Sequence, residues 1–228
     1  MVSRLQKLEF LLKQKNQIHL REASELLGVS EMTIRRDINS GNTPFNLLGG
    51  YIIFAQKDKN NYHVIEQQSK HISEKLKLGE KAAKLIEEDD IVFFDCGSTI
   101  PFVASQIDDA LRFTAICCSL NTFNILIEKP NCKVILIGGE YTPNNAAFSP
   151  LNYQNDLDLL FTDKAFISAA GISQEKGASC FELSEANIKR QAMKKTKQAI
   201  LIADQSKQDK VYTAFICQLS EFDQIIIE

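Results

Sequence analysis

Residues 26–38 read Leu26-Leu27-Gly28-Val29-Ser30-Glu31-Met32-Thr33-Ile34-Arg35-Arg36-Asp37-Ile38, and this stretch decides the fold of the N-terminal part. Gly28 stands where a helix would end in the left-handed conformation, which costs glycine little. Val29 is then expected to point inward, and the hydroxyl of Ser30 can cap the next helix. The pattern predicts two helices joined by a tight turn.

The second of these helices has an apolar and a polar side. Ile34 and Ile38 are four residues apart, so they share one face, which we expect to be buried. Short polar and guanidinium groups at the front of such a helix are suited to the major groove of DNA. The residues predicted to contact DNA are Ser30, Met32, Thr33, Arg35 and Arg36. A plain surface helix is the alternative, but cap, turn and apolar spacing together favour DNA binding.

The flanking sequence extends this motif to a small domain. Leucines at helical spacing predict a first helix over 3–15, and the motif itself supplies helices over 21–27 and 30–40. Residues 18–20 are expected to form a short extended link. Residues 47–54 predict two short strands hinged on Gly49 and Gly50. Three helices and a hairpin make a winged helix-turn-helix domain over 1–56. The hairpin tip either touches the DNA backbone or minor groove, or only closes the small core.

The pattern of apolar residues changes after a polar linker, which we place at 57–75. From residue 76 onward, short β-rich runs alternate with helical stretches. This alternation predicts an α/β domain with a largely parallel sheet over 76–228. The predicted strands are 91–94, 113–118, 133–137, 164–168, 199–203 and 224–227.

Composition narrows the class of protein. The 228 residues are 44% hydrophobic, enough for two ordinary cores, and no apolar run approaches the roughly 20 residues that span a bilayer. Without a signal-peptide pattern either, we expect a cytoplasmic protein with no membrane partner. The net charge is -3, divided into +2 for residues 1–56 and -5 for the rest. A mildly basic N-terminal domain is suited to binding DNA. Because its charge is small, a single copy would bind DNA weakly, so we expect a homo-oligomer.

The six cysteines show no Cys-x-x-Cys spacing, and no histidine is near them in the sequence. We therefore expect reduced thiols and no metal site.

Ligands of open α/β sheets bind beyond the carboxyl ends of the strands, so the loops there are the candidate site. The first is Asp95-Cys96-Gly97-Ser98-Thr99, which leads into a helix. Its small residues allow backbone N–H groups and hydroxyls to surround an anion, as a phosphate cradle requires. A tight strand-to-helix turn with capping hydroxyls is an equally good interpretation of this loop. It is not a nucleotide P-loop, because no Gly-Lys-Ser/Thr follows.

Other predicted strand-end loops also carry glycine, amide or charged residues. Together they suggest one pocket for a small polyhydroxy phosphate, with Lys207 as a phosphate partner and the acids as acceptors of sugar hydroxyls. For any single acid, a cap or a surface charge is the better interpretation. These further candidates are Asn121, Gly138, Gly139, Asp163, Asp204 and Lys207.

The chain resembles the DeoR family of bacterial sugar-metabolism repressors. The motifs that carry the likeness lie at 27–37, 48–52, 94–97, 119–123, 138–140, 168–171 and 204–207, so it covers nearly the whole chain. It implies a winged helix-turn-helix joined to an α/β sensor domain similar to ribose-5-phosphate isomerase. It also implies that a sugar phosphate, deoxyribose-5-phosphate for the most similar members, releases a repressor from the operator of a deoxyribose or deoxyribonucleoside operon.

By this likeness, Gly97, Ser98 and Thr99 would hold the phosphate with Lys207 nearby, and Asp95, Asp163 and Glu185 would meet the sugar. The likeness implies no cofactor. Family members continue into a further helical segment, whereas this sequence ends at Glu228 after a predicted strand.

Two other functions stay open at this point. An aldose–ketose phosphate isomerase would need a carboxylate base beside the sugar, for which Glu185 is the candidate with help from Asp163. A DNA-binding domain has no role in isomerisation, so we expect a regulator and not an enzyme. A constitutive DNA-binding protein would differ in that no sugar phosphate stabilises it.

Overall fold

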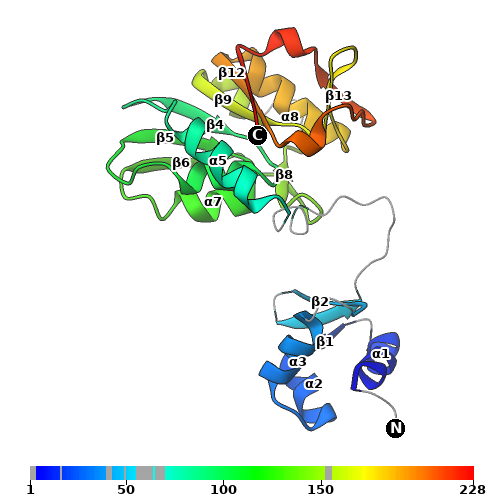
Figure 1. The fold of residues 1–228 in the computed structure, drawn as a ribbon. Helices are drawn as coiled ribbons and strands as arrows, with labels where there is room; N and C mark the ends of the chain where they lie inside the picture. Colours follow the sequence, from blue (N-terminus) through cyan, green and yellow to red (C-terminus); the bar gives the residue numbers. More distant parts are fainter. Residues whose placement is uncertain are drawn as a thin grey trace. The chain divides into compact units, whose positions relative to one another are not determined.

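The computed structural model describes residues 4–15, 17–39, 43–48, 50–54, 64, 70–151 and 156–228. The chain divides into two compact units, Met1–Asn60 and Asn61–Glu228 (Figure 1). Most of the predicted linker at 57–75 lies outside the described residues, so its boundaries stay predictions.

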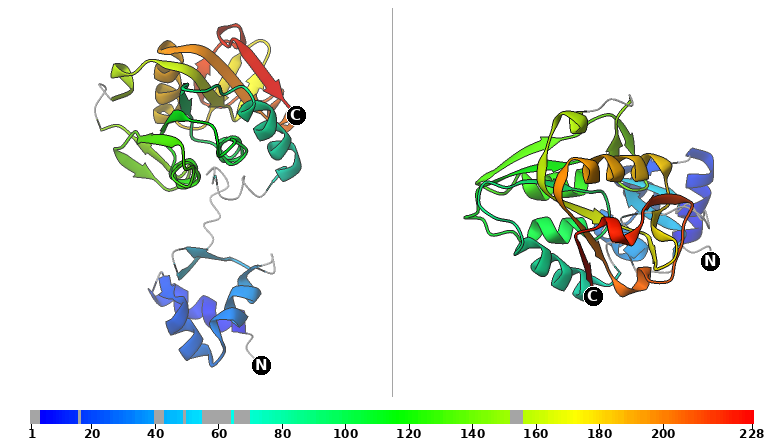
Figure 2. Two further views of the ribbon diagram at one scale, coloured as in Figure 1. Left: turned by 90° about the vertical axis from the view of Figure 1, so that its left-hand side faces the viewer. Right: turned by 90° about the horizontal axis from the view of Figure 1, so that it is seen from above.

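The first unit has the predicted three helices and wing. The helices are α1 (Arg4–Lys15), α2 (Leu20–Leu27) and α3 (Glu31–Asn39). They lie on one side of a small antiparallel sheet (Figure 2), whose order is β1-β3-β2. Its strands are β1 (Gln17–His19), β2 (Phe45–Leu48) and β3 (Tyr51–Phe54). The extended link predicted at 18–20 is thus a third strand, because residues 17–19 pair with β3. Gly49, one of the two predicted hinge glycines, lies outside the described residues.

The core of this unit explains the turn between α2 and α3. Ile34 and Ile38 are buried as predicted, together with leucines of α1 and Ile52 of the wing. Gly28 has a φ of 64°, the left-handed conformation expected after a helix. Val29 packs against the core, and its carbonyl accepts a hydrogen bond of 2.6 Å from the Ser24 hydroxyl. The turn is therefore held by the packing of the Val29 side chain and by the hydrogen bond to the Val29 carbonyl.

The second unit is built on a six-stranded sheet of order β14-β12-β9-β4-β5-β6. Every neighbouring pair in it is parallel. All six predicted runs are confirmed as strands of this sheet. They are β4 (Ile91–Phe94), β5 (Phe113–Cys117), β6 (Cys132–Leu136), β9 (Thr162–Ser168), β12 (Thr196–Ala203) and β14 (Gln224–Ile227).

Both faces of this sheet are covered, which explains why its strands are continuous apolar runs. Phe94 points into the core beneath α5 (Ile72–Ala83), α6 (Ile100–Ser105) and α7 (Leu120–Leu126). Its neighbour Phe93 points into the opposite core, against α8 (Leu183–Lys194). Figure 1 shows α5 and α7 on one side of the sheet and α8 on the other.

Shorter elements complete the unit, and the sequence reasoning did not predict them. A three-stranded antiparallel sheet joins the α8 side, and a two-stranded hairpin follows β6. Their strands are β7 (Glu140–Thr142), β8 (Ala147–Ser149), β10 (Gly171–Ser173), β11 (Gly177–Cys180) and β13 (Ala214–Cys217). The single-turn helices are η1 (Asp156–Leu159), η2 (Gln205–Lys207) and η3 (Leu219–Glu221).

Within the described part of the chain, every helix is too short or too polar to cross a bilayer.

Candidate functional site

The polar side of α3 is open to solvent. Met32 is 75% exposed, and Arg35 and Arg36 are exposed as well. Among the described residues, no ion pair engages either guanidinium. The Ser30 hydroxyl accepts from the Thr33 N–H at 3.2 Å and lies 2.9 Å from the Thr33 hydroxyl. Ser30 therefore caps the helix as predicted, and two guanidinium groups stay available for an anionic partner.

The order of the large sheet creates a switch point between β4 and β9. From β4 the chain adds β5 and β6 on one side, and from β9 it adds β12 and β14 on the other. Asp95 directly follows β4, and Ser168 ends β9. The Asp95 carboxylate accepts from the Ser168 N–H at 2.9 Å and lies 2.7 Å from its hydroxyl. A crevice at such a point is where open α/β sheets bind ligands.

A buried ion network lies directly under this point. Lys189 of α8 pairs with Asp95, and its ammonium lies 3.4 Å from the carboxylate of Glu185; all three side chains are buried. Burial lowers the pKa of Lys189, but the Asp95 and Glu185 carboxylates outweigh it and hold that pKa well above its usual value. Burial raises the pKa of Glu185, against the opposing effect of Lys189. One ammonium is thus shared by two carboxylates.

Sequence reasoning missed Lys189. The available signal is its spacing, since Lys189 stands four residues after Glu185 on a helix face that also carries the buried Ala186 and Ala192. A lysine on such a face indicates a buried partner. Only the fold shows that this partner is Asp95, which lies 94 positions away in the sequence.

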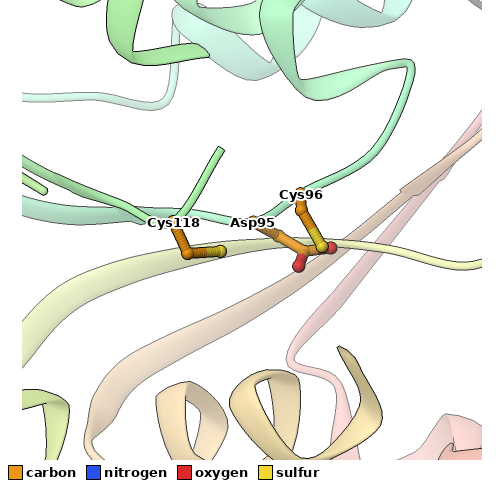
Figure 3. A group of neighbouring side chains, drawn as sticks. All are labelled: Asp95, Cys96 and Cys118. Atoms are coloured by element: carbon orange, nitrogen blue, oxygen red, sulfur yellow. The ribbon is translucent and has the colours of Figure 1, made fainter. Parts of the chain in front are cut away.

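Asp95, Cys96 and Cys118 also form a group whose ligand atoms lie within 4.8 Å of one another (Figure 3). The Cys96 thiol donates to Glu185 at 3.4 Å, and its pKa is raised well above the usual value by its hydrogen bond with Cys118 and by burial. Cysteine binds a metal ion such as zinc as a thiolate, and the ammonium of Lys189 already neutralises Asp95. The group is therefore better suited to hold protons than a metal ion.

The loop 97–99 packs tightly at the switch point. A Cβ at Gly97 would lie 2.3 Å from the Ser168 hydroxyl oxygen, so only glycine allows this approach. Ser98 and Thr99 are both 4% exposed. The structure therefore brings this loop together with Asp95 and Glu185, three of the predicted features.

A second polar loop follows β12. The Asp204 carboxylate accepts from the Ser206 N–H at 3.0 Å, so it caps η2, and its Oδ2 has no hydrogen-bond partner among the described residues. The Lys207 ammonium lies 3.9 Å from that Oδ2 atom. Burial lowers the pKa of Lys207, and Asp204 opposes this effect. The carboxyl end of β12 lies two strands from β4, which places this loop beside the switch point.

Asp163 is not brought to this edge. It lies near the amino end of β9, where it accepts from the Ile91 N–H at 2.8 Å and pairs with Lys197 at 2.7 Å. Lys197 and that N–H lower its pKa. Asp163 therefore forms a structural ion pair with Lys197 at the opposite edge of the sheet.

The remaining candidates, Gly138, Gly139 and Asn121, follow strands on the β5–β6 side of the sheet. Gly138 and Gly139 follow β6, which is four strand spacings from β12, or about 19 Å. A pentose phosphate is too short to reach from these glycines to Lys207. Asn121 lies in the first turn of α7 and lines a surface cavity of about 370 Å³ with residues of α6. Its Nδ2 atom is buried, and the described residues offer it no acceptor.

A winged helix-turn-helix joined to an α/β domain with a cluster of buried polar side chains at its switch point is the architecture of a ligand-responsive DNA-binding regulator. The family model for the DeoR-like helix-turn-helix domain matches residues 4–54, and the model for the DeoR C terminal sensor domain matches 70–228. The chain belongs to the DeoR family.

Its relatives include the deoxyribose operon repressor of Escherichia coli (strain K12). The two are 44% identical over 215 residues, which cover 94% of this chain and 85% of the repressor. The lactose phosphotransferase system repressor of Staphylococcus aureus (strain NCTC 8325 / PS 47) is 31% identical over 236 residues, covering 99% and 91%. Both are named as repressors and neither as an enzyme.

Among solved structures, ribose 5 phosphate isomerase A from Neisseria gonorrhoeae matches with a TM-score of 0.40 and 17% identity. The match covers 61% of this chain and 53% of that one. A likeness of this size carries no argument about function.

Proposed function

We propose that the chain is a transcriptional repressor of a deoxyribose operon, released from its operator by deoxyribose-5-phosphate. The observation that carries this proposal is its 44% identity, along 94% of its length, with a protein named deoxyribose operon repressor. A regulator also accounts for the helix-turn-helix unit, which an isomerase would not need. Glu185 would be the catalytic base of an isomerase. In this structure its carboxylate lies beside the ammonium of Lys189, which also pairs with Asp95.

We assign operator contacts to the front of α3. Arg35 and Arg36 supply the guanidinium groups, and the exposed Met32 offers an apolar contact to a thymine methyl. Ser30 and Thr33 reach the DNA from the first turn while they cap the helix. A single copy carries few such groups, so a homo-oligomer that binds two half-sites is part of the proposal.

We place the sugar phosphate beyond the carboxyl ends of β4 and β12, between the loops 97–99 and 204–207. In this proposal Ser98, Thr99 and Lys207 bind the phosphate, and Asp204 Oδ2, which accepts no hydrogen bond from the described residues, accepts one from a hydroxyl. Asp95 and Glu185 are already shared by Ser168, Lys189 and Cys96, so they position the loops beneath the ligand. Asn121 borders the site. Asp163, Gly138 and Gly139 are left out, because of their places in the sheet.

The proposed mechanism is a linkage between two states of the oligomer. The ligand binds better to the state whose DNA-binding units are spaced wrongly for the operator, and so it moves the population away from DNA. A difference in ligand affinity worth about 3 kcal/mol would lower operator affinity roughly 150-fold.

The test is operator binding by fluorescence anisotropy, with and without deoxyribose-5-phosphate, and with ribose-5-phosphate as control. Release by the deoxy sugar alone supports both the repressor and its effector. A ligand at 100 times its Kd should also raise the free energy of unfolding by about 2.7 kcal/mol. If neither sugar changes the operator affinity or the melting temperature, deoxyribose-5-phosphate is refuted as the effector, the DNA-binding assignment stands, and other phosphorylated metabolites are tested next.

A further inference from the structure

Val64 belongs to the connecting sequence, residues 55–71, which lies between β3 and α5. The Val64 side chain is 1% exposed, and its backbone N–H donates to the Asn144 carbonyl oxygen at 2.7 Å. Burial of an apolar side chain and a backbone hydrogen bond both stabilise a contact. Val64 is therefore an anchor that attaches the connecting sequence to the α/β domain.

The anchor is attached to the turn between β7 and β8, residues 143–147. The Ala146 N–H donates to the Pro143 carbonyl oxygen at 3.3 Å and closes this turn. Ala146 has a φ of 49°, which a residue with a Cβ keeps only where the surrounding structure holds it. Ala147 is buried in the core that faces α8. The turn is therefore held in a strained conformation by its neighbours.

The same turn is bonded to the loop that follows β5. The Leu120 N–H donates to the Ala146 carbonyl oxygen at 2.8 Å, and Ser119 forms an antiparallel bridge with Ala147. The next residue is Asn121, which borders the proposed ligand site, and β5 is the neighbour of β4 in the sheet. A continuous series of backbone contacts thus runs from the loop 119–121, through the turn 143–147, to Val64.

The place of the anchor sets the length of the connection. Phe54 ends β3, and it precedes Val64 by ten residues and Ile72, the first residue of α5, by eighteen. A fully extended chain of these lengths spans at most about 36 Å and about 65 Å. Keeping or releasing the anchor therefore changes the greatest reach of the connecting sequence almost twofold.

We propose that the Val64 anchor is the point at which the effector controls the DNA-binding unit. The inference rests on the proposed function and names how its site is regulated. A ligand at the carboxyl edge of the sheet moves the loop 119–121, the turn 143–147 passes this movement on, and the hold on Val64 changes. The connecting sequence then has two lengths, which are the two states that the ligand and the operator favour differently. Val64 touches neither ligand nor DNA, so it is a positioning residue.

The first measurement is amide hydrogen exchange by NMR on the full chain without ligand or DNA. The variants are Val64→Ser and the milder Val64→Ala, and the matched control is Val211→Ser, at a valine of the same domain that is 50% exposed. We expect both Val64 variants to speed the exchange of the Leu120 amide about tenfold, because the turn that accepts its hydrogen bond is loosened. Val211→Ser should leave it unchanged. Amides of β12 show whether each variant is folded.

The second measurement is operator binding by fluorescence anisotropy, with and without saturating deoxyribose-5-phosphate. The unmodified chain and Val211→Ser should lose operator affinity by the roughly 150-fold proposed above. The Val64 variants should still bind the operator, and calorimetry should show that they still bind the sugar phosphate. Their operator affinity should change less than about threefold on adding ligand, because the two sites are no longer coupled.

Unchanged exchange of the Leu120 amide in folded Val64 variants overturns this inference alone. So does a Val64 variant whose operator affinity falls with ligand as in the unmodified chain. Loss of protection across β12 in both Val64 variants also overturns it, because Val64 would then be part of the core and not a local anchor. If the operator affinity of the unmodified chain does not respond to the sugar phosphate, the proposed effector fails, and the regulatory role of Val64 fails with it.

Discussion

The ammonium of Lys189 and the carboxylate of Asp95 form an ion pair in which both side chains are fully buried, although 94 positions separate them in the sequence. Replacing Lys189 with methionine leaves Asp95 and Glu185 without their cation in the interior. We expect a loss of about 3–5 kcal/mol in the free energy of unfolding, the usual result of breaking a buried pair. Urea denaturation followed by circular dichroism measures it.

The control is the double variant Asp95→Asn with Lys189→Met. It removes both charges, so its loss should be clearly smaller than the sum of the two single losses. Additive losses would show that the two groups do not act as a pair.

Glu185 should make stability depend on pH. Burial raises its pKa in the folded chain, so folding favours the protonated form. Its stabilising effect is complete below the pKa of the unfolded chain and is lost as the pH rises through the raised folded value. Glu185→Gln removes this loss, so its stability relative to the unmodified chain should increase as the pH rises above the usual pKa of a glutamate. Melting curves measured from acidic to neutral pH give the difference.

The exposed Glu182, which immediately precedes α8, gives the matched control for that experiment. Glu182→Gln should follow the melting curve of the unmodified chain at every pH. A Glu185→Gln variant that instead loses stability as the pH rises would mean that the carboxylate is needed by Lys189 despite its burial.

Gly97 and Gly138 offer a comparison between two predicted ligand loops. A Cβ at position 97 would lie 2.3 Å from the Ser168 hydroxyl oxygen, whereas a Cβ at position 138 meets nothing within 4 Å. We expect Gly97→Ala to cost about 1–3 kcal/mol of stability through overpacking and to weaken the response to sugar phosphate. Gly138→Ala should change neither property. Equal melting temperatures for the two variants would contradict the close packing of loop 97–99.

Arg36 tests how α3 reads DNA. It is exposed and forms no ion pair among the described residues, so Arg36→Ala should leave the melting temperature unchanged. If it contacts a base edge, the variant loses about 1–3 kcal/mol of affinity, and only for operators that carry the matching base at one position. Anisotropy with a set of operator variants measures this. An equal loss on every operator would assign Arg36 to the phosphate backbone.

Much of the fold was predictable, because its signals are local. The glycine turn, the Ser30 cap and the spacing of Ile34 and Ile38 concern residues within one or two helical turns of each other, and the structure confirms each of them. The six strands of the large sheet were recognisable as apolar runs, because a parallel sheet covered on both faces needs them. The strands of three or four residues on the α8 side were missed, because runs that short give no periodic signal.

The candidate site was predictable only in part. Loops 97–99 and 204–207 follow strands, and that is visible in the sequence. Asp163 stands in the same kind of apolar run, but its place near the start of β9 sends it to the opposite edge, beside Lys197.

Local patterns in the sequence were enough to predict the helix-turn-helix unit, its separation from the α/β domain, and which loops carry polar groups. The tertiary structure decided the strand order, and with it which loops are neighbours. It decided that Lys189 meets Asp95 and that Gly138 lies four strands from Lys207. The physical reason is the range of the interactions: capping, turns and helix faces depend on residues a few positions apart. Strand order and buried charge pairs depend instead on the burial and hydrogen bonding of the whole domain.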